Sequence, residues 1–117
     1  MPRPHKYGAV STEYNGVTYA SQVEATRAAE LDLLVRGGVI DRWRRQVHFP
    51  LGEDFGTVVD FLVESNGKTW VEEVKGFETS DFHRVRRLWQ KYGPVPMLIL
   101  KRKGNGWLKE TIERSET

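Results

Sequence analysis

One dipeptide, Asn66-Gly67, constrains the fold of this chain more than any other feature of its sequence. An Asn-Gly pair between two apolar runs is the strongest short signal for a two-residue hairpin loop, because both loop residues adopt a positive φ. The flanking runs, residues 57–64 and 69–75, are rich in valine, phenylalanine, threonine and tryptophan and are predicted to be antiparallel strands. A two-residue loop also fixes which residues of the two strands face each other.

The predicted register places Asp60 directly opposite Glu73, with Lys75 on the same face of the sheet. Directly opposed side chains have Cβ atoms about 5 Å apart, so two carboxylates there repel each other, and their apolar neighbours add a desolvation cost. A divalent cation removes this conflict, since Mg²⁺ binds one or two carboxylates and substrate phosphate together. The alternative is a half-exposed edge hairpin with solvated acids.

Alternation along the strands assigns neighbouring residues to opposite faces. Leu62 shares the face of Asp60, whereas Val59 and Glu72 share the other face. Glu73, rather than Glu72, is therefore the candidate metal ligand, and a slip of one residue in the register would reverse this choice.

The remaining elements are predicted from capping residues, periodicity and turns. In chain order we expect a loose basic arm over about 1–13, a short strand over 16–20, a helix from Ser21 to Gly37-Gly38, a strand over 40–49, the two hairpin strands, a helix from Ser80 or Asp81 to Tyr92, a buried strand over 95–100, and a strand or short helix over 107–112. The apolar faces of the helices are predicted to consist of Val23, Leu31, Leu34 and Val35, and of Phe82, Val85, Leu88, Trp89 and Tyr92. This order of helix, three strands, helix and strand predicts an α/β fold in which helices flank a central mixed sheet. No linker divides the sequence, so residues 1–117 are predicted to form one domain.

The charges are distributed unevenly along the chain. Residues 51–78 are predominantly acidic, whereas residues 36–48, 81–91 and 101–109 are predominantly basic. An acidic centre inside basic flanks fits a nucleic-acid enzyme with a cation site, and the alternative is scattered, solvated surface charge. The sequence has no cysteine, which excludes a disulfide scaffold and thiolate chemistry. Its longest apolar run is too short to span a bilayer and no signal core follows the N-terminus, so a cytoplasmic protein without a membrane partner is expected.

The catalytic pattern resembles that of a known superfamily. Asp60, followed after the hairpin by Glu73-Val74-Lys75, resembles the signature of the restriction-endonuclease-like PD-(D/E)xK nucleases, with Val59 where the usual proline stands. Residues 19–25, which include Glu24, resemble the first-helix segment whose glutamate completes the metal site. The short length, Val59-Asp60-Phe61 and residues 71–76 are most similar to the small phage and archaeal Holliday junction resolvases.

This resemblance implies a restriction-endonuclease-like core and a homodimeric, Mg²⁺-dependent endodeoxyribonuclease, in which Mn²⁺ would substitute for Mg²⁺. It would resolve four-way DNA junctions by phosphodiester hydrolysis in the cytoplasm, or in the host cytoplasm if the chain is encoded by a phage. The resemblance assigns catalytic roles to Glu24, Asp60, Glu73 and Lys75, and metal ligation to Asp60, Glu73, Glu24 and the backbone carbonyl of Val74. Lys75 would position the attacking water and offset charge on the phosphate.

Basic side chains are predicted to contact the DNA backbone. The predicted contacts are Arg84, Arg87 and Lys91 at helical spacing, Arg42 and Arg44 on one strand face, and Lys101 and Lys103. Gln46 shares the face of Arg42 and Arg44 and is a weaker candidate. The arm residues Arg3, His5 and Lys6 are further candidates. Solvated helix and strand surfaces are the alternative for all of them.

Other functions stay open on the sequence alone. The chain would also suit a nuclease of the same fold that acts on other branched DNA, nicks DNA, or serves a recombination or restriction assembly. A catalytically silent DNA-binding module is the alternative from a different class. A capping box accounts for Glu24 without catalysis, and a strand lysine extended towards solvent accounts for Lys75.

Overall fold

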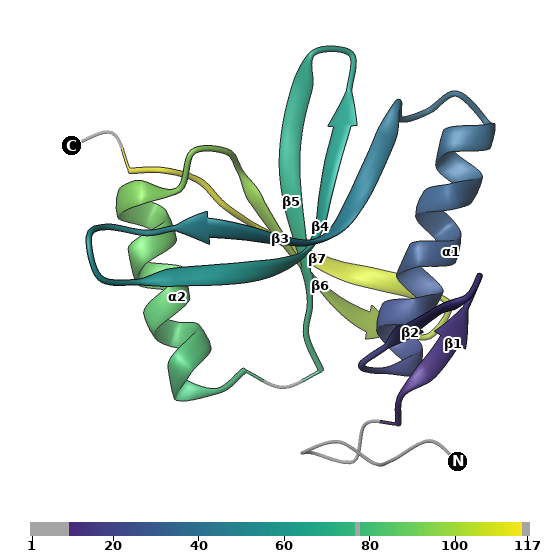
Figure 1. Cartoon of the computed structure of the whole chain (residues 1–117), viewed down its shortest axis with the longest axis horizontal. Coiled ribbons are helices and arrows are strands. Elements are labelled where there is room, and N and C mark those ends of the chain that lie inside the picture. Colours follow the sequence, from purple (N-terminus) through teal and green to yellow (C-terminus); the bar gives the residue numbers. More distant parts are fainter. Residues whose placement is uncertain (1–9, 77, 116–117) are drawn as a thin grey trace. The chain divides into compact units, whose positions relative to one another are not determined.

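The computed structural model describes residues 10–76 and 78–115. The chain divides after Ile40 into two compact units, and each unit is described by itself. Figure 1 labels the helices and strands of both units. None of the helices in the described ranges combines the length and apolar content that crossing a bilayer requires.

The first unit contains a small hairpin, formed by β1 (Thr12–Tyr14) and β2 (Val17–Tyr19). Its loop is a second Asn-Gly pair, in which Asn15 has φ 52° and Gly16 has φ 78°. Residues up to 13 were predicted to be part of a loose arm, so this prediction is wrong for β1. The rest of that arm, residues 1–9 with Arg3, His5 and Lys6, lies outside the described residues.

Helix α1 (Gln22–Arg36) begins and ends at the predicted residues. Ser21 is its N-cap, and Gly37 ends it by donating its backbone N–H to the carbonyl of Leu33 at 2.9 Å. Its buried apolar residues are Ala25, Ala28 and Leu31. Val35, which was assigned to the apolar face, is exposed, because the buried stripe follows the small alanines instead.

The second unit is built on a mixed sheet, as predicted, and the described part of the chain as a whole is of the mixed α/β class. The sheet has five strands, because the segment predicted as a strand or short helix over 107–112 is a strand. Its strands are β3 (Arg42–Pro50), β4 (Gly56–Ser65), β5 (Lys68–Val74), β6 (Met97–Lys103) and β7 (Gly106–Ile112). They lie side by side in the order of the chain. Neighbours are antiparallel except β5 and β6, which are parallel and are connected by helix α2 (Ser80–Tyr92). Parallel strands require such a crossover connection.

The hairpin of β4 and β5 has the predicted register, with Leu62 opposite Val71. Its loop residues Asn66 and Gly67 have φ values of 53° and 78°. Both values are positive, as a two-residue loop of this kind requires.

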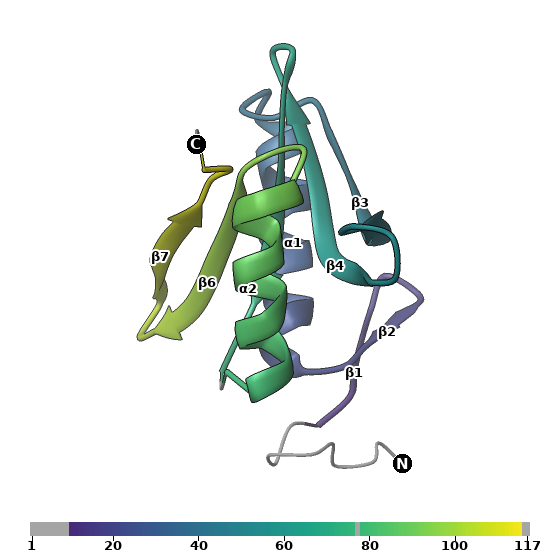
Figure 2. The same ribbon diagram turned by 90° about the vertical axis from the view of Figure 1, so that its left-hand side faces the viewer.

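Helix α2 covers one face of this sheet (Figure 2). The buried core between helix and sheet consists of Phe82, Val85 and Trp89 from α2 together with Leu51, Val59, Leu62, Val71, Met97, Ile99 and Ile112. Trp89 is fully buried and its indole N–H donates to the carbonyl of Val95 at 2.8 Å. Burial of this aromatic and its hydrogen bond together fix the helix on the sheet.

The ends of α2 differ from the prediction. The N-cap is Thr79, whose hydroxyl accepts from the backbone N–H of Phe82 at 3.2 Å, and not Ser80 or Asp81. Tyr92 was predicted to face inward but is 40% exposed. It is the last helical residue, and its ring lies against Gly52 in the loop between β3 and β4.

Strands β3 and β4 bend partway along their length (Figure 1). Their register pairs Arg45 with Phe61, steps over Gln46, and resumes with Val47 opposite Val59. Gln46 has φ 55°, a left-handed conformation that is rare inside a strand.

The bend reverses the face on which the following side chains lie. Phe49 meets Trp89 edge-to-face at 5.3 Å between ring centroids, and Val59 belongs to the core beneath α2. The prediction that Val59 and Leu62 lie on opposite faces is therefore wrong, because strict alternation assumes an uninterrupted strand.

Candidate functional site

The carboxylates of Asp60 on β4 and Glu73 on β5 each accept a hydrogen bond from a backbone N–H of the other strand. The Glu73 carboxylate accepts from the backbone N–H of Asp60, and the Asp60 carboxylate accepts from the backbone N–H of Val74, each at 2.8 Å. The Cα register of the two strands ends one pair earlier, at Phe61 opposite Glu72. At this point the two side chains therefore take over the connection between the strands. Asp60 and Glu73 meet across the hairpin, as their register predicted.

Lys75 lies next to this pair. Its ammonium is 3.3 Å from Oε2 of Glu73 and 4.4 Å from the ring centroid of Phe82, at the start of α2. Its backbone N–H donates to the carbonyl of Leu100 at 2.8 Å, which continues the alignment with β6 beyond the end of β5. An ammonium held between a carboxylate and an aromatic face is restricted in position. We call Asp60, Glu73 and Lys75 the carboxylate cluster.

The carboxylate cluster is partly shielded from water. Glu73 is 6% exposed and Asp60 is half-buried. Burial disfavours a charged carboxylate unless donors compensate, and the two backbone N–H groups and the ammonium supply such donors.

Glu72 is separated from the carboxylate cluster although it is adjacent to Glu73. It is fully buried, and its carboxylate accepts from the indole N–H of Trp70 at 3.0 Å. The hairpin register thus distinguishes the two neighbouring acids in the predicted way.

The carboxylate oxygens of Asp60 and Glu73 suit a hard divalent cation. Among residues 10–76 and 78–115, no three or more Asp, Glu or His side chains gather in an arrangement that could hold a metal ion. Mg²⁺ needs only one or two protein carboxylates, since it retains several waters and binds substrate phosphate. The carboxylates of Asp60 and Glu73, each hydrogen-bonded to the other strand, meet this requirement. Metal ligation by the backbone carbonyl of Val74 remains a prediction.

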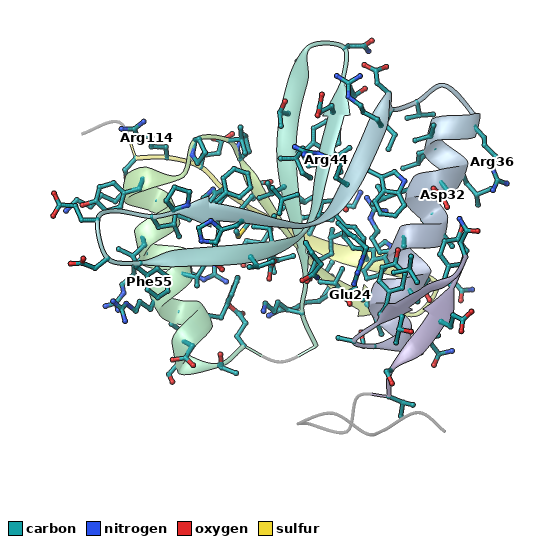
Figure 3. All side chains as sticks on the ribbon, in the orientation of Figure 1. Glu24, Asp32, Arg36, Arg44, Phe55 and Arg114 are labelled. Carbon is teal, nitrogen blue, oxygen red and sulfur yellow. The ribbon has the colours of Figure 1, made fainter. Side chains whose placement is uncertain are left out.

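Glu24 completes the cap of α1. Its backbone N–H donates to the hydroxyl of Ser21 at 3.1 Å, and its carboxylate accepts from the backbone N–H of Ala20 at 3.0 Å. This is close to the predicted capping box, with the carboxylate reaching one residue beyond the N-cap. Glu24, labelled in Figure 3, belongs to the first unit, and its metal-binding role stays a prediction.

The predicted basic contacts occupy different surroundings. Arg42 pairs with Glu64 at 2.6 Å, and Arg44, labelled in Figure 3, is exposed two residues further along β3. The guanidinium of Arg84 stacks over the ring of Phe55 at 4.4 Å. The remaining residues of this set, apart from Lys101, are exposed: Arg87, Lys91 and Lys103.

Lys101 is part of an ion network that no sequence pattern predicts. Glu78 accepts from Lys101 at 2.8 Å and from Arg86 at 2.6 Å, and Arg86 also binds Glu110. The Arg86 guanidinium, followed by the Lys101 ammonium, lowers the pKa of Glu78 to about 2. We call these four residues the Glu78 network. No local spacing signals it, because its members come from α2, β6, β7 and the segment before α2.

Comparisons with known proteins place the chain in a family. A family model described as "Protein of unknown function (DUF1064)" matches residues 4–102. A search of curated proteins gives no match. A solved structure described as "Crystal structure of SSO0001" aligns with a TM-score of 0.44 and 11% sequence identity, covering 79% of this chain and 50% of that one. The chain thus spans about half the length of that protein. Because the family model covers most of the sequence, the chain belongs to the DUF1064 family.

Proposed function

We propose that the protein is a Mg²⁺-dependent endodeoxyribonuclease of the PD-(D/E)xK type that cleaves branched DNA, with the four-way junction as its main substrate. The observation that carries the proposal is the carboxylate cluster. Asp60 and Glu73 hold each other's strands through 2.8 Å hydrogen bonds, and Lys75 lies 3.3 Å from Glu73. These are the residue types, in the order Asp then Glu-Val-Lys, that the superfamily resemblance assigns to catalysis.

In this proposal Asp60 and Glu73 hold the metal ion. Mg²⁺ bound there supplies positive charge that polarises the scissile phosphate and lowers the pKa of a coordinated water. Lys75 orients the attacking water and stabilises negative charge that develops on the phosphate. The aromatic face of Phe82, 4.4 Å from the ammonium, holds Lys75 close to Glu73.

The restriction-endonuclease-like arrangement belongs to the same proposal. The mixed sheet supports it, because β4 and β5 carry the acidic residues on a hairpin and α2 follows directly. We propose a homodimer as well, since two sites are needed to cut the two opposed strands of a junction in one binding event. Light scattering of the purified chain tests the dimer independently of cleavage.

A catalytically silent DNA-binding module is the competing function. One observation favours it: both acidic side chains accept from backbone N–H groups, so they would also stabilise the pairing of β4 and β5. Replacing each acid with its amide separates a catalytic role from this structural role, because an amide oxygen still accepts a backbone hydrogen bond but binds Mg²⁺ poorly.

The test is cleavage of an end-labelled four-way junction, with matched duplex, flap and single strand alongside, in Mg²⁺ and in EDTA. We expect symmetric cuts near the branch point in Mg²⁺ alone, and loss of cutting with retained junction binding for Asp60→Asn. Glu64→Gln is the matched control, because Glu64 is a half-buried acid of the same strand that pairs with Arg42. It should cut normally.

Three results would contradict parts of this proposal. Undiminished cutting by Asp60→Asn would exclude the metal site. Cutting of every branched form would replace the resolvase with a general structure-selective nuclease. Tight junction binding without cutting in Mg²⁺ or Mn²⁺ would support the silent module.

A further inference from the structure

A basic pocket lies beside the C-terminal half of α2, away from the carboxylate cluster. It has a volume of about 340 Å³ and is lined by Arg87, Gln90, Lys91, Arg114 and Ser115. Figure 3 shows Arg114 in the segment that follows β7, close to this end of the helix. Three of the five lining residues are cationic and none is acidic.

The pocket wall is fixed by a backbone contact. The backbone N–H of Ser115 donates to the carbonyl of Gln90 at 2.7 Å, which ties the segment after β7 to the last turns of α2. Arg87 and Lys91 are four residues apart and therefore project from the same side of the helix. The three cations are thus brought together by two segments that are distant in the sequence.

The three pocket cations differ from the neighbouring Arg86. Arg86 binds Glu78 and Glu110, whereas Arg87, Lys91 and Arg114 are exposed, and the Lys91 ammonium lies 5.2 Å from the ring centroid of Tyr92. Within residues 10–76 and 78–115, the salt bridges of this structure involve none of the three pocket cations.

The chemistry of the lining selects an anion. A helix C-terminus carries a partial negative charge of about half an elementary charge, which three cations outweigh. Guanidinium groups bind phosphate oxygens in bidentate fashion, and Gln90 and Ser115 add neutral hydrogen-bonding groups. An apolar ligand would find no apolar side chain among the five lining residues.

We propose that this pocket binds a backbone phosphate of the DNA substrate as a second point of attachment. The inference rests on the proposed function and extends it, because it assigns DNA affinity to Arg114 and to a place distant from the bond that is cut. Lys91 lies nine residues after Phe82, whose ring touches Lys75. At about 1.5 Å of rise per residue, these two positions are roughly 13 Å apart along the helix axis.

The test measures binding of a fluorescein-labelled junction by anisotropy in EDTA, where no cleavage occurs. The variant combines Arg87→Ala, Lys91→Ala and Arg114→Ala. Its control combines Arg36→Ala, Lys68→Ala and Lys109→Ala, which remove the same charge at exposed positions outside the pocket. Circular dichroism melts of both variants confirm that they fold.

We expect the pocket variant to bind the junction at least tenfold more weakly. Its dependence of log K on log salt should become shallower by about one for each phosphate that the variant no longer neutralises. The junction affinity of the control should remain within about threefold of the original value. Both variants lose the same net charge, so a larger loss in the pocket variant reports the pocket contacts themselves. Equal weakening in the two variants, or unchanged binding by the pocket variant, would overturn the assignment.

A second arm identifies the source of the phosphate group. Inorganic phosphate and a nucleoside monophosphate are titrated onto the original chain by calorimetry. Tight binding of either one that is abolished in the pocket variant, with unchanged junction affinity, would make the pocket a small-anion site and overturn the DNA assignment.

The assay separates the two proposals. If the original chain does not cleave but the pocket variant binds the junction more weakly, the nuclease proposal is contradicted and the pocket proposal is retained. If the original chain cleaves and the pocket variant binds the junction normally, the pocket proposal is contradicted and the nuclease proposal is retained.

Discussion

The carboxylate cluster and the Glu78 network each contain two acidic side chains, but they differ in the groups that those acids accept from. In the Glu78 network, two carboxylates meet a guanidinium and an ammonium, so acidic and basic charges are equal in number. In the carboxylate cluster, each acid accepts from a backbone N–H of the other strand, and one ammonium adjoins Glu73.

Under the proposed function, this difference separates a structural use of acids from a chemical one. A carboxylate paired with a guanidinium or an ammonium has its charge balanced, and it holds together the segments that carry those cations. A carboxylate held by backbone amides is positioned but keeps its charge, and a shielded site strengthens its attraction for a metal ion. The comparison predicts that amide substitutions will affect catalysis in one group and stability in the other.

The largest expected effect is that of Glu73→Gln on cleavage. The amide oxygen still accepts from the backbone N–H of Asp60 and the 3.3 Å pair with Lys75 is lost, so stability should change by about 1 kcal/mol. Because the proposed function makes Glu73 one of two acidic metal ligands, the substitution should lower the Mg²⁺-dependent cleavage rate about 1000-fold. Single-turnover cleavage and urea denaturation of the same samples check both values. A large loss of stability with normal cleavage would contradict the distinction between the carboxylate cluster and the Glu78 network.

Lys75→Met should have the next largest effect. Methionine keeps the apolar stem against Phe82 but removes the ammonium, so cleavage should fall about 100-fold while junction affinity in EDTA remains. Lys68→Met, at an exposed position at the start of β5, is the matched control. Equal cleavage rates for the two variants would contradict a catalytic role of Lys75.

Glu78→Gln should reverse the pattern of Glu73→Gln. Its carboxylate is 17% exposed and accepts from two cations, so its loss should cost about 2 kcal/mol of unfolding free energy. Cleavage measured well below the melting temperature should stay within about threefold of the original rate. A cleavage loss as large as that of Glu73→Gln would contradict the structural role of the network.

Acid should weaken the Glu78 network in a defined window. The pKa of Glu78 is lowered from 4.5 to about 2 in the folded chain, so its stabilisation is complete above about pH 4.5 and is lost as the pH falls towards 2. Urea midpoints at pH 7, 4.5 and 3 should show a decline below pH 4.5 that is smaller in Glu78→Gln. Parallel declines in the two chains would assign the acid sensitivity to other carboxylates.

The smallest expected effect concerns Gln46, which lies level with Asp60 where the β3–β4 register is interrupted. Gln46→Gly should stabilise the fold by about 0.5–1 kcal/mol, because glycine adopts φ 55° without the strain of a side chain. Arg44→Gly, in regular strand conformation two residues earlier, should destabilise it by a similar amount. Thermal melts of both variants make the comparison.

The parts of the fold that depend on local rules were predictable from the sequence. The hairpin register came from Asn66-Gly67, and the cap of α1 came from Ser21 and Glu24, because the atoms involved are close together in the chain. The meeting of Asp60 and Glu73 follows from the same register. Strand β1 was equally accessible, since Asn15-Gly16 is the same turn signal as Asn66-Gly67.

The parts that depend on tertiary packing were not predictable in this way. Lys101 and Glu78 are 23 residues apart in the sequence, and no periodicity connects them. The placement of Val59 failed because one left-handed residue on the neighbouring strand, Gln46, accompanies a bend of both strands. A local pattern carries no information about such a bend until the core beneath α2 is known.

The order of strands in the sheet has a consequence for synthesis of the chain. Each strand of the second unit pairs with the strand made just before it, so the sheet can grow at one edge while the C-terminal part is still being translated. Strands β4 and β5, which carry Asp60 and Glu73, join early through a two-residue loop. Strand β6, whose first four residues are apolar, gains its last neighbour only when β7 has been made. A ribosome that stalls before β7 would therefore leave a nascent chain with an open, aggregation-prone edge next to an already paired β4–β5 hairpin.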